Sequence, residues 1–220
     1  MKSDTADAHW NKEWANIQDG SKWLTPELDV QNWAKGLTPG ARILDLGAGV
    51  GRHALWLAHN GFEVTALDAA PEGLKEIEKA GGVKTVLARM DQLPFDDQSF
   101  DHVLSWNVIY HGDDTLLQRT IAEIHRITKP GGSYLGTMLS NRRLPHELAR
   151  YEGREISRNT WVFDAPDTDK IHPHYFCNAQ DLLALFQGFE VSWLEDREHE
   201  KPGSWHWHLL MERLDMEQQQ

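Results

Sequence analysis

Three glycines at alternate positions constrain this chain more than any other feature. Gly47, Gly49 and Gly51 follow the apolar run 43–46 and precede a helix-like segment at 52–59. Glycine there allows a tight strand-to-helix turn and lets a ligand approach the backbone closely. The first N–H groups of the helix are free to bind and carry a positive partial charge. The loop therefore predicts an α/β fold that binds a ligand at this turn.

Short apolar runs alternate with helix-like segments beyond the loop. The predicted strands are 43–46, 63–67, 85–88, 102–106, 133–139, 189–194 and 205–211. The predicted helices between them are 52–59, 71–79, 115–128 and 179–186. Such alternation implies right-handed crossovers and a parallel sheet. The last two strands are joined only by the polar stretch 195–203, which favours a hairpin and an antiparallel last strand.

Two segments depart from this alternation. Residues 1–40 are helical in pattern and rich in tryptophan, and 140–177 is polar and rich in arginine. We therefore expect five parts: a helical lid at 1–40, a ligand-binding core at 41–140, an inserted substrate cap at 141–177, a closing helix and strand hairpin at 178–215, and a frayed tail at 216–220.

Composition excludes several classes of protein. Lys and Arg number 22 against 34 Asp and Glu, and the net charge of −12 argues against a nucleic-acid partner. The single cysteine, Cys177, excludes a disulfide framework and cysteine-rich metal cages. The chain has no signal-peptide pattern and no run of about 18 apolar residues, so we expect a cytoplasmic protein with no membrane partner.

An acidic residue near the glycine loop indicates a ribose-containing cofactor. Asp68 ends the second predicted strand, 21 residues after Gly47, where a carboxylate can accept both ribose hydroxyls. A dinucleotide loop has the spacing G-x-G-x-x-G, but here Arg52 takes the place of the third glycine. The Asp45 carboxylate also suits a cationic ligand better than a pyrophosphate. A nicotinamide-dependent oxidoreductase is therefore the less favoured alternative.

Residues 43–139 resemble the class I S-adenosylmethionine-dependent methyltransferases. The resemblance rests on the segments LDLGAGVGRHALWLA, VTALD, LPFDDQSFDHVLSWNVIYH and HRITKPGGSYLGTML. It implies a Rossmann-like three-layer α/β sandwich, with a seven-stranded, mostly parallel sheet and an antiparallel last strand. It also implies in-line transfer of a methyl group from S-adenosyl-L-methionine to a small-molecule acceptor, as in tellurite-resistance and quinone-biosynthesis type enzymes. The alternative is a protein that binds this cofactor without methyl transfer. The oligomeric state is not predicted.

The resemblance also assigns residues to the cofactor. The three glycines would pack against its methionyl and ribose parts, with Asp45 near the methionyl ammonium. Asp68 would hold the ribose hydroxyls. Met90 would contact the adenine, but Arg89 stands where relatives carry an acidic residue, so Asp91 is the substitute acceptor. Ser105 and Trp106, at the end of the fourth strand, would face the methyl group.

Residues just beyond the fourth strand suggest the acceptor side. His111 is the candidate general base, because histidine titrates near neutrality. Its alternative is a helix-start histidine that contacts the cofactor or a carbonyl. Tyr110 precedes it. Trp10 and Trp14 lie four residues apart and would form a lid over the cationic sulfonium, or else fill the core.

Arginines and histidines form two further patterns. Arg142 and Arg143, with the later arginines at 150, 154 and 158, would clamp an anionic acceptor or form a solvated helix face paired with glutamates. His172 with His174, and His206 with His208, are two His-x-His pairs that share a face in a strand. We predict no metal site, because no carboxylate or cysteine has the spacing to complete one, and these four histidines are the only candidates. The competing interpretation of the second pair is an exposed last strand with polar side chains on one face and Trp207 packed inward on the other.

Overall fold

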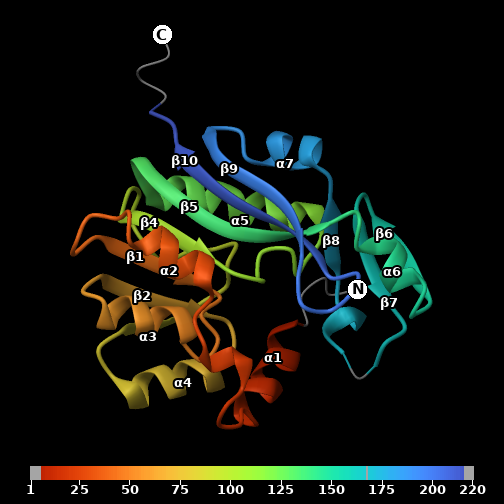
Figure 1. Ribbon diagram of the computed structural model, residues 1–220, viewed down its shortest axis with the longest axis horizontal. Coiled ribbons are helices and arrows are strands. Elements are labelled where there is room, and N and C mark those ends of the chain that lie inside the picture. Colours follow the sequence, from red (N-terminus) through yellow and green to blue (C-terminus); the bar gives the residue numbers. More distant parts are fainter. Residues whose placement is uncertain (1–5, 167, 216–220) are drawn as a thin grey trace.

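The computed structural model describes residues 6–166 and 168–215, so the predicted tail at 216–220 lies outside the described residues (Figure 1). Five strands form the parallel part of the sheet. In spatial order they are β3 (Lys84–Leu87), β2 (Glu63–Asp68), β1 (Arg42–Leu46), β4 (Phe100–Ser105) and β5 (Thr128–Ser140). The central strands are buried almost throughout, which explains why their sequences are nearly continuous apolar runs.

The C-terminal hairpin adds two strands to these five, and with three strands from the insertion the described residues form a ten-stranded sheet rather than the predicted seven-stranded one. β10 (Trp205–Arg213) lies between β5 and β9 (Phe189–Glu198) and is antiparallel to both. The prediction of a mostly parallel sheet with an antiparallel last strand is therefore confirmed. The last strand is not exposed, because β5 and β9 cover its two edges (Figure 1).

The insertion extends this sheet with three strands that the sequence did not reveal. They are β6 (Gly153–Ser157), β7 (Thr160–Phe163) and β8 (His174–Cys177), preceded by the short helix α6 (Leu144–Leu148). β8 pairs with the end of β5 through Leu139–Phe176 and Ser140–Cys177. β6 is an exposed edge strand with a polar sequence, so it lacks the alternation that marks a half-buried strand.

Helices cover both faces of the sheet. α2 (Leu28–Ala34), α3 (Arg52–His59) and α4 (Pro71–Ala80) bury one apolar cluster against β1 and β2. α5 (Asp114–Ile127) and α7 (Ala179–Leu185) bury a second cluster with β4, β5 and the hairpin. The three-layer sandwich is confirmed. No helix in the described ranges has both the length and the apolar character that a bilayer crossing requires.

The N-terminal helix lies at the lower rim of the sandwich in Figure 1. α1 (Ala6–Ala15) packs on α4, and the Asn11 side chain accepts a hydrogen bond from the Glu72 N–H at 2.9 Å. Trp14 is buried against Val50 and Ala70. A short 3-10 helix, η1 (Lys22–Leu24), follows. α1 is thereby fixed beside the glycine loop.

Candidate functional site

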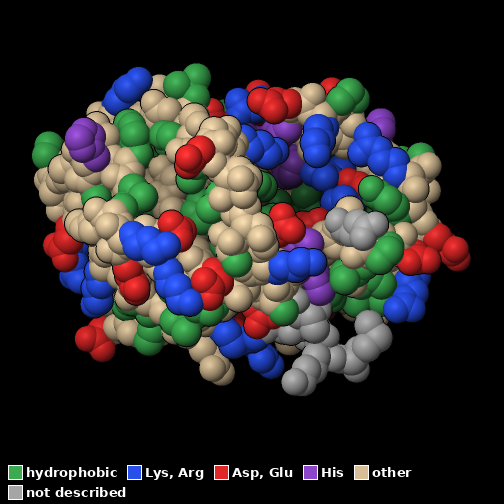
Figure 2. Space-filling view, turned by 90° about the horizontal axis from the view of Figure 1, so that it is seen from below, with side chains coloured by type: hydrophobic (Ala, Val, Ile, Leu, Met, Phe, Trp, Pro, Cys, Tyr) green, Lys and Arg blue, Asp and Glu red, His purple; other side chains and the backbone are tan. Residues whose placement is uncertain are grey.

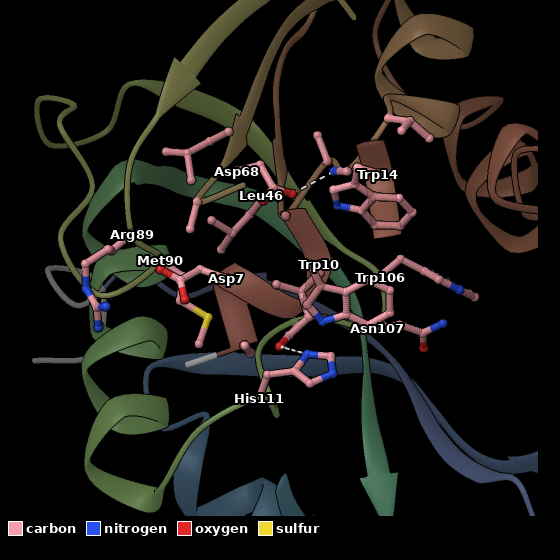
Figure 3. Close-up of a pocket in the computed structure, with 18 of the residues that line it drawn as sticks. Asp7, Trp10, Trp14, Leu46, Asp68, Arg89, Met90, Trp106, Asn107 and His111 are labelled. Atoms are coloured by element: carbon pink, nitrogen blue, oxygen red, sulfur yellow. Dashed lines mark hydrogen bonds between the residues drawn. The ribbon is translucent and has the colours of Figure 1, made fainter. Parts of the chain in front are cut away.

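A pocket lies at the carboxyl ends of β1, β2 and β4 (Figure 3). Parallel sheets of this kind bind ligands at that edge, where the strand order reverses. Its walls come from the glycine loop, Asp68, Arg89 and Met90, the turn 106–111 and the first residues of α1. The residues that line the pocket are thus spread along the chain between Ala6 in α1 and Leu116.

Two of the loop glycines are required by their surroundings. Gly47 has φ +75°, and a Cβ atom there would lie 2.3 Å from a methyl carbon of Val108. Gly49 has φ +55°, and its Cβ would lie 2.9 Å from the Trp14 ring. Both conformations are strained for any other residue. The loop therefore has no room for side chains at these two positions, because Val108 in the turn after β4 lies against one and Trp14 of α1 lies against the other.

Asp68 connects the loop to the second strand. Its Oδ2 accepts a hydrogen bond from the Gly49 N–H at 2.7 Å, and its Oδ1 accepts one from the Ala70 N–H at 2.8 Å. Burial raises the pKa of this carboxyl, and these backbone donors oppose the rise. Each oxygen retains a second lone pair, so the carboxylate can accept further hydrogen bonds from a ligand in the pocket.

Asp45 is buried behind the pocket wall, is not among the described lining residues, and has Arg52 as its nearby opposite charge. Burial raises its pKa to about 7, and the nearby Arg52 opposes that rise. Arg52 donates a hydrogen bond to Glu27 at 2.9 Å, and the Asp45 Oδ2 has no hydrogen-bond partner among the described residues. A cationic group in the pocket would supply the missing stabilisation.

Four tryptophans gather at the pocket. Trp10 stacks on Trp14 with ring centres 5.1 Å apart, and Trp23 meets both rings edge-on at 5.7 and 5.6 Å. Trp106 enters from the end of β4, opposite the loop (Figure 3). We refer to Trp10, Trp14, Trp23 and Trp106 as the tryptophan cluster. Such faces attract cations and exclude water.

Other predicted cofactor residues lie at different depths. Met90 and Arg89 line the pocket, whereas Asp91 pairs with Arg89 at 3.1 Å and is not among the described lining residues. Ser105 is fully buried behind the wall, and the lining at this point comes from Trp106 and Asn107. The predicted adenine acceptor at Asp91 is therefore turned toward Arg89, which a linear motif does not reveal.

His111 lines the pocket at its acceptor side. Its Nδ1 faces the Val108 carbonyl at 2.9 Å, and its Nε2 lies 3.4 Å from Asp169 Oδ2. Asp169 belongs to η2 (Asp169–Ile171) in the insertion and also faces His174. Tyr110 packs beside His111 with ring centres 4.6 Å apart and is not among the described lining residues. Sequence reasoning missed Asp169, because nothing in the spacing links it to His111.

The predicted arginine cluster does not converge on the pocket. The exposed Arg142 pairs with Asp196 at 3.2 Å, and Arg143 pairs with the buried Glu147 at 2.7 Å. Arg158 pairs with Asp181 at 3.1 Å. The solvated-helix alternative is also wrong, because α6 contains only five residues and the later arginines lie in or beside β6.

The His-x-His pairs are not chelating pairs. His172 ends η2 before β8 begins, so it does not share a strand face with His174. His206 and His208 share a face of β10, where Arg143 engages the first at 3.0 Å and Asp29 engages the second at 2.9 Å. His199, just after β9, joins them, because its ring stacks on His206 and its Nε2 lies 2.7 Å from His208 Nε2. Burial in the sheet lowers the pKa of His208 to about 4. Both histidines are buried, whereas Trp207 on the opposite face is only half-buried, so the expectation of an exposed histidine face is wrong.

Comparison with known proteins identifies the domain. The family described as a methyltransferase domain matches residues 44–136. An uncharacterized methyltransferase of Synechocystis is 31% identical over 121 residues, which are 54% of this chain and 56% of that protein. The chain spans about half the length of the curated relatives it matches, and less of some.

Solved structures share the fold. An S-adenosylmethionine-dependent methyltransferase from Methanosarcina mazei superposes with a TM-score of 0.73 at 23% identity, covering 87% of this chain and 99% of that one. The 1,6-didemethyltoxoflavin-N1-methyltransferase of Burkholderia thailandensis, with S-adenosylhomocysteine bound, has a TM-score of 0.70 at 18% identity, covering 94% and 85%. Residues 44–136 are therefore similar to a methyltransferase domain, and the fold is the one that S-adenosylmethionine-dependent methyltransferases share.

Proposed function

We propose that this protein transfers the methyl group of S-adenosylmethionine to a small-molecule acceptor. The observation that carries the proposal is the pocket that joins the glycine loop and Asp68 to the tryptophan cluster. A ribose-binding carboxylate, a loop too close-packed for a side chain, and aromatic faces suited to a sulfonium all meet there.

The residues present fit this cofactor. The buried, unpartnered Asp45 Oδ2 suits the methionyl ammonium, and the free lone pairs of Asp68 suit the ribose hydroxyls. Met90, which lines the pocket beyond Asp68, suits an adenine ring. When bound, the cofactor supplies an electrophilic methyl group on a cationic sulfur with a neutral leaving group.

The protein's own contribution is alignment and exclusion of water. Within the tryptophan cluster, Trp10 and Trp14 of α1 and the neighbouring Trp23 line one side of the pocket. Trp106 and Asn107 form its wall at the end of β4. His111 is the residue placed to accept a proton from an acceptor, because its ring lines the pocket and is only 9% exposed.

A small acceptor fits the surroundings better than a macromolecule. The space beside His111 is bounded by α1 and by the insertion, whose η2 contacts α1. Figure 2 shows a hollow in the lower face of the molecule, with His, Lys and Arg side chains and also Asp and Glu side chains around it. A small molecule with polar groups suits this mixed lining, whereas the net charge of −12 opposes a nucleic acid.

The test has two stages. Calorimetry with S-adenosylhomocysteine and with NAD first establishes the cofactor, and we expect binding only of the former. Transfer from methyl-labelled S-adenosylmethionine is then followed into small-molecule, protein and nucleic-acid fractions of a cell extract, with Gly47→Ala, for which the loss of cofactor binding should be largest, as the control. Label in the small-molecule fraction is expected. Label confined to a macromolecular fraction would overturn the acceptor class, and binding without any transfer would favour a cofactor-binding protein.

A further inference from the structure

Three side chains from separate segments converge beside the pocket. His111 precedes α5, Asp169 begins η2, and His174 begins β8. The Nε2 atoms of both histidines lie 3.4 Å from the same atom, Asp169 Oδ2. One ligand atom from each of the three lies within 4.8 Å of the other two.

The other ring nitrogens fix the tautomers. His111 Nδ1 faces the Val108 carbonyl at 2.9 Å, and His174 Nδ1 faces the His172 carbonyl at 2.8 Å. A carbonyl oxygen can only accept, so each Nδ1 carries a proton. In a neutral imidazole the Nε2 atom is then a bare lone pair. Two nitrogen lone pairs therefore face one carboxylate oxygen. The nitrogen lone pairs and the negatively charged oxygen repel one another unless a cation lies between them.

The alternative is that one or both rings are doubly protonated and donate to Asp169. His174 is only 2% exposed, and burial disfavours the charged imidazolium. The distances also fit poorly, because 3.4 Å exceeds the usual N–H···O range of about 2.7–3.2 Å. A separation of 3.4 Å is about the edge of a tetrahedron whose centre lies about 2.1 Å from each ligand, as around a zinc ion, so the two N···O distances suit a shared ion. The two histidine nitrogens lie within 4.8 Å of each other and would have to approach as the ion binds.

The surroundings resemble those of a metal centre with an open position. Nδ1–H donation to a backbone carbonyl is the usual way that a metal-binding histidine is oriented. Lys170 approaches the other carboxylate oxygen, Asp169 Oδ1, at 4.0 Å and also pairs with Glu147 at 3.5 Å, which leaves Oδ2 for the ion. Three protein ligands are fewer than the four of a closed structural zinc site.

We propose that His111, Asp169 and His174 bind a divalent first-row transition-metal ion such as Zn²⁺ at the acceptor side of the pocket. The site replaces the two His-x-His pairs as the metal candidate, because only His174 of those four histidines belongs to it. His111 also lines the pocket and its ring lies 5.8 Å from that of Trp10, so the ion lies next to the bound acceptor. There the ion would occupy the His111 Nε2 lone pair, which is then not available to accept a proton, and would itself orient an acceptor through a lone pair. This role rests on the proposed methyl transfer and replaces the base role of His111.

The direct test uses the metal alone. Tag-free protein is stripped with a chelator, and Co²⁺ is added while the visible absorption of the protein-bound ion is followed. Wild type should bind about one equivalent, and Zn²⁺ should displace it. Asp169→Asn, which keeps the side-chain volume, and His174→Gln should each weaken binding at least about tenfold. His59→Gln removes an exposed histidine from α3 and should bind as wild type does.

The outcomes separate this proposal from the proposed function. Binding below about 0.1 equivalent in wild type, or equal affinity in wild type and Asp169→Asn, would overturn the metal site. Thermal unfolding of each variant identifies any loss that results from misfolding, and the wild-type titration does not depend on the variants. S-adenosylhomocysteine binding to stripped protein should be unchanged. If S-adenosylhomocysteine binds neither the stripped nor the metal-loaded protein, the proposed function is contradicted, whereas the metal titration remains valid.

Discussion

The cofactor half and the acceptor half of this pocket are built in different ways. In the cofactor half, Gly49 and Asp68 meet across a gap of 19 residues, within one strand–helix–strand unit. In the acceptor half, His111 meets Asp169 across 58 residues, and Arg143 meets His206 across 63. Farther along the same side, Asp29 of α2 contacts His208 across 179 residues.

The geometry of the cofactor half is set by the backbone, and the geometry of the acceptor half is set by side-chain interactions. The loop depends on backbone conformation, with positive φ angles and no room for a Cβ atom. The acceptor half depends on buried charges and imidazoles that neutralise or repel one another. A change in the loop should therefore affect the cofactor strongly, whereas a change in the acceptor half should spare the cofactor. The following experiments test that contrast.

Gly47→Ala should have the largest effect. Its Cβ would lie 2.3 Å from Val108, at a φ of +75°, so either the loop or the β4 turn must shift. We expect at least a hundredfold loss of S-adenosylhomocysteine affinity and a loss of about 1–3 kcal/mol of unfolding free energy. Calorimetry and chemical unfolding measure the two. Gly61→Ala, with φ +89° but no atom within 4 Å of its Cβ, is the matched control for strain alone. Equal losses of affinity in both variants would contradict the steric account.

Asp68→Asn should have the next largest effect. An amide keeps the shape but halves the oxygen acceptors and removes the charge, while Gly49 and Ala70 still require acceptors for their N–H groups. We expect a loss of affinity of about 10- to 100-fold, equivalent to about 1.5–3 kcal/mol for hydrogen bonds to a charged group. Calorimetry measures it, with Asp96→Asn on the exposed turn after Phe95 as the control. An unchanged affinity would remove Asp68 from ribose recognition.

The same contrast explains how far the sequence predicts the molecule. The glycine loop, Asp68 and the positions of seven strands along the chain were predictable, because each depends on residues close together in the chain. The tilt of Asp91 toward Arg89 was not predictable, since it depends on a side-chain pairing. The convergence of His111, Asp169 and His174 was not predictable either. It arises because β8 adds to the end of β5 and carries η2 toward α1, a long-range pairing with no periodic signal.

Asp45→Asn should change how stability depends on pH. The pKa of this carboxyl is about 7 in the folded protein against an ordinary value of 3.8, so between these values the folded state holds a proton that the unfolded state has released. Stability of the wild type therefore falls as pH rises through this window. The variant has no carboxyl to titrate, so its free energy of unfolding does not fall in this way. Relative to the wild type, that free energy should therefore rise by up to about 3 kcal/mol as the pH increases from about 5 to about 8. Urea unfolding across that range measures it, and parallel curves for the two proteins would contradict the buried charge.

Trp10→Ala should separate the lid from the core. Trp10 is half-buried in the tryptophan cluster, so its loss should weaken S-adenosylhomocysteine binding about tenfold with little change in the melting temperature. Trp33→Ala is the opposite case, because Trp33 packs against the α2–α3 core and donates to Ser133. It should cost about 2–4 kcal/mol of stability and leave the affinity intact. A large stability loss in Trp10→Ala with unchanged binding would show that the cluster is core.

Arg142→Ala should have the smallest effect and addresses the acceptor half alone. Its side chain is 64% exposed, pairs with Asp196 and lies 5.1 Å from the Trp205 ring centre. Arg142 is exposed, whereas the Asp196 side chain is only 9% exposed and keeps a hydrogen bond from Ser140 when the arginine is removed. The ion pair and the exposed cation–π contact are each worth about 0.5–1 kcal/mol, so stability should fall by no more than about 2 kcal/mol. Affinity for S-adenosylhomocysteine should stay the same, because Arg142 contributes nothing to the loop. If Arg142 also binds an anionic acceptor, only the KM for that acceptor rises. A fall in cofactor affinity would instead show that the two halves are coupled, and would break the comparison on which these predictions rest.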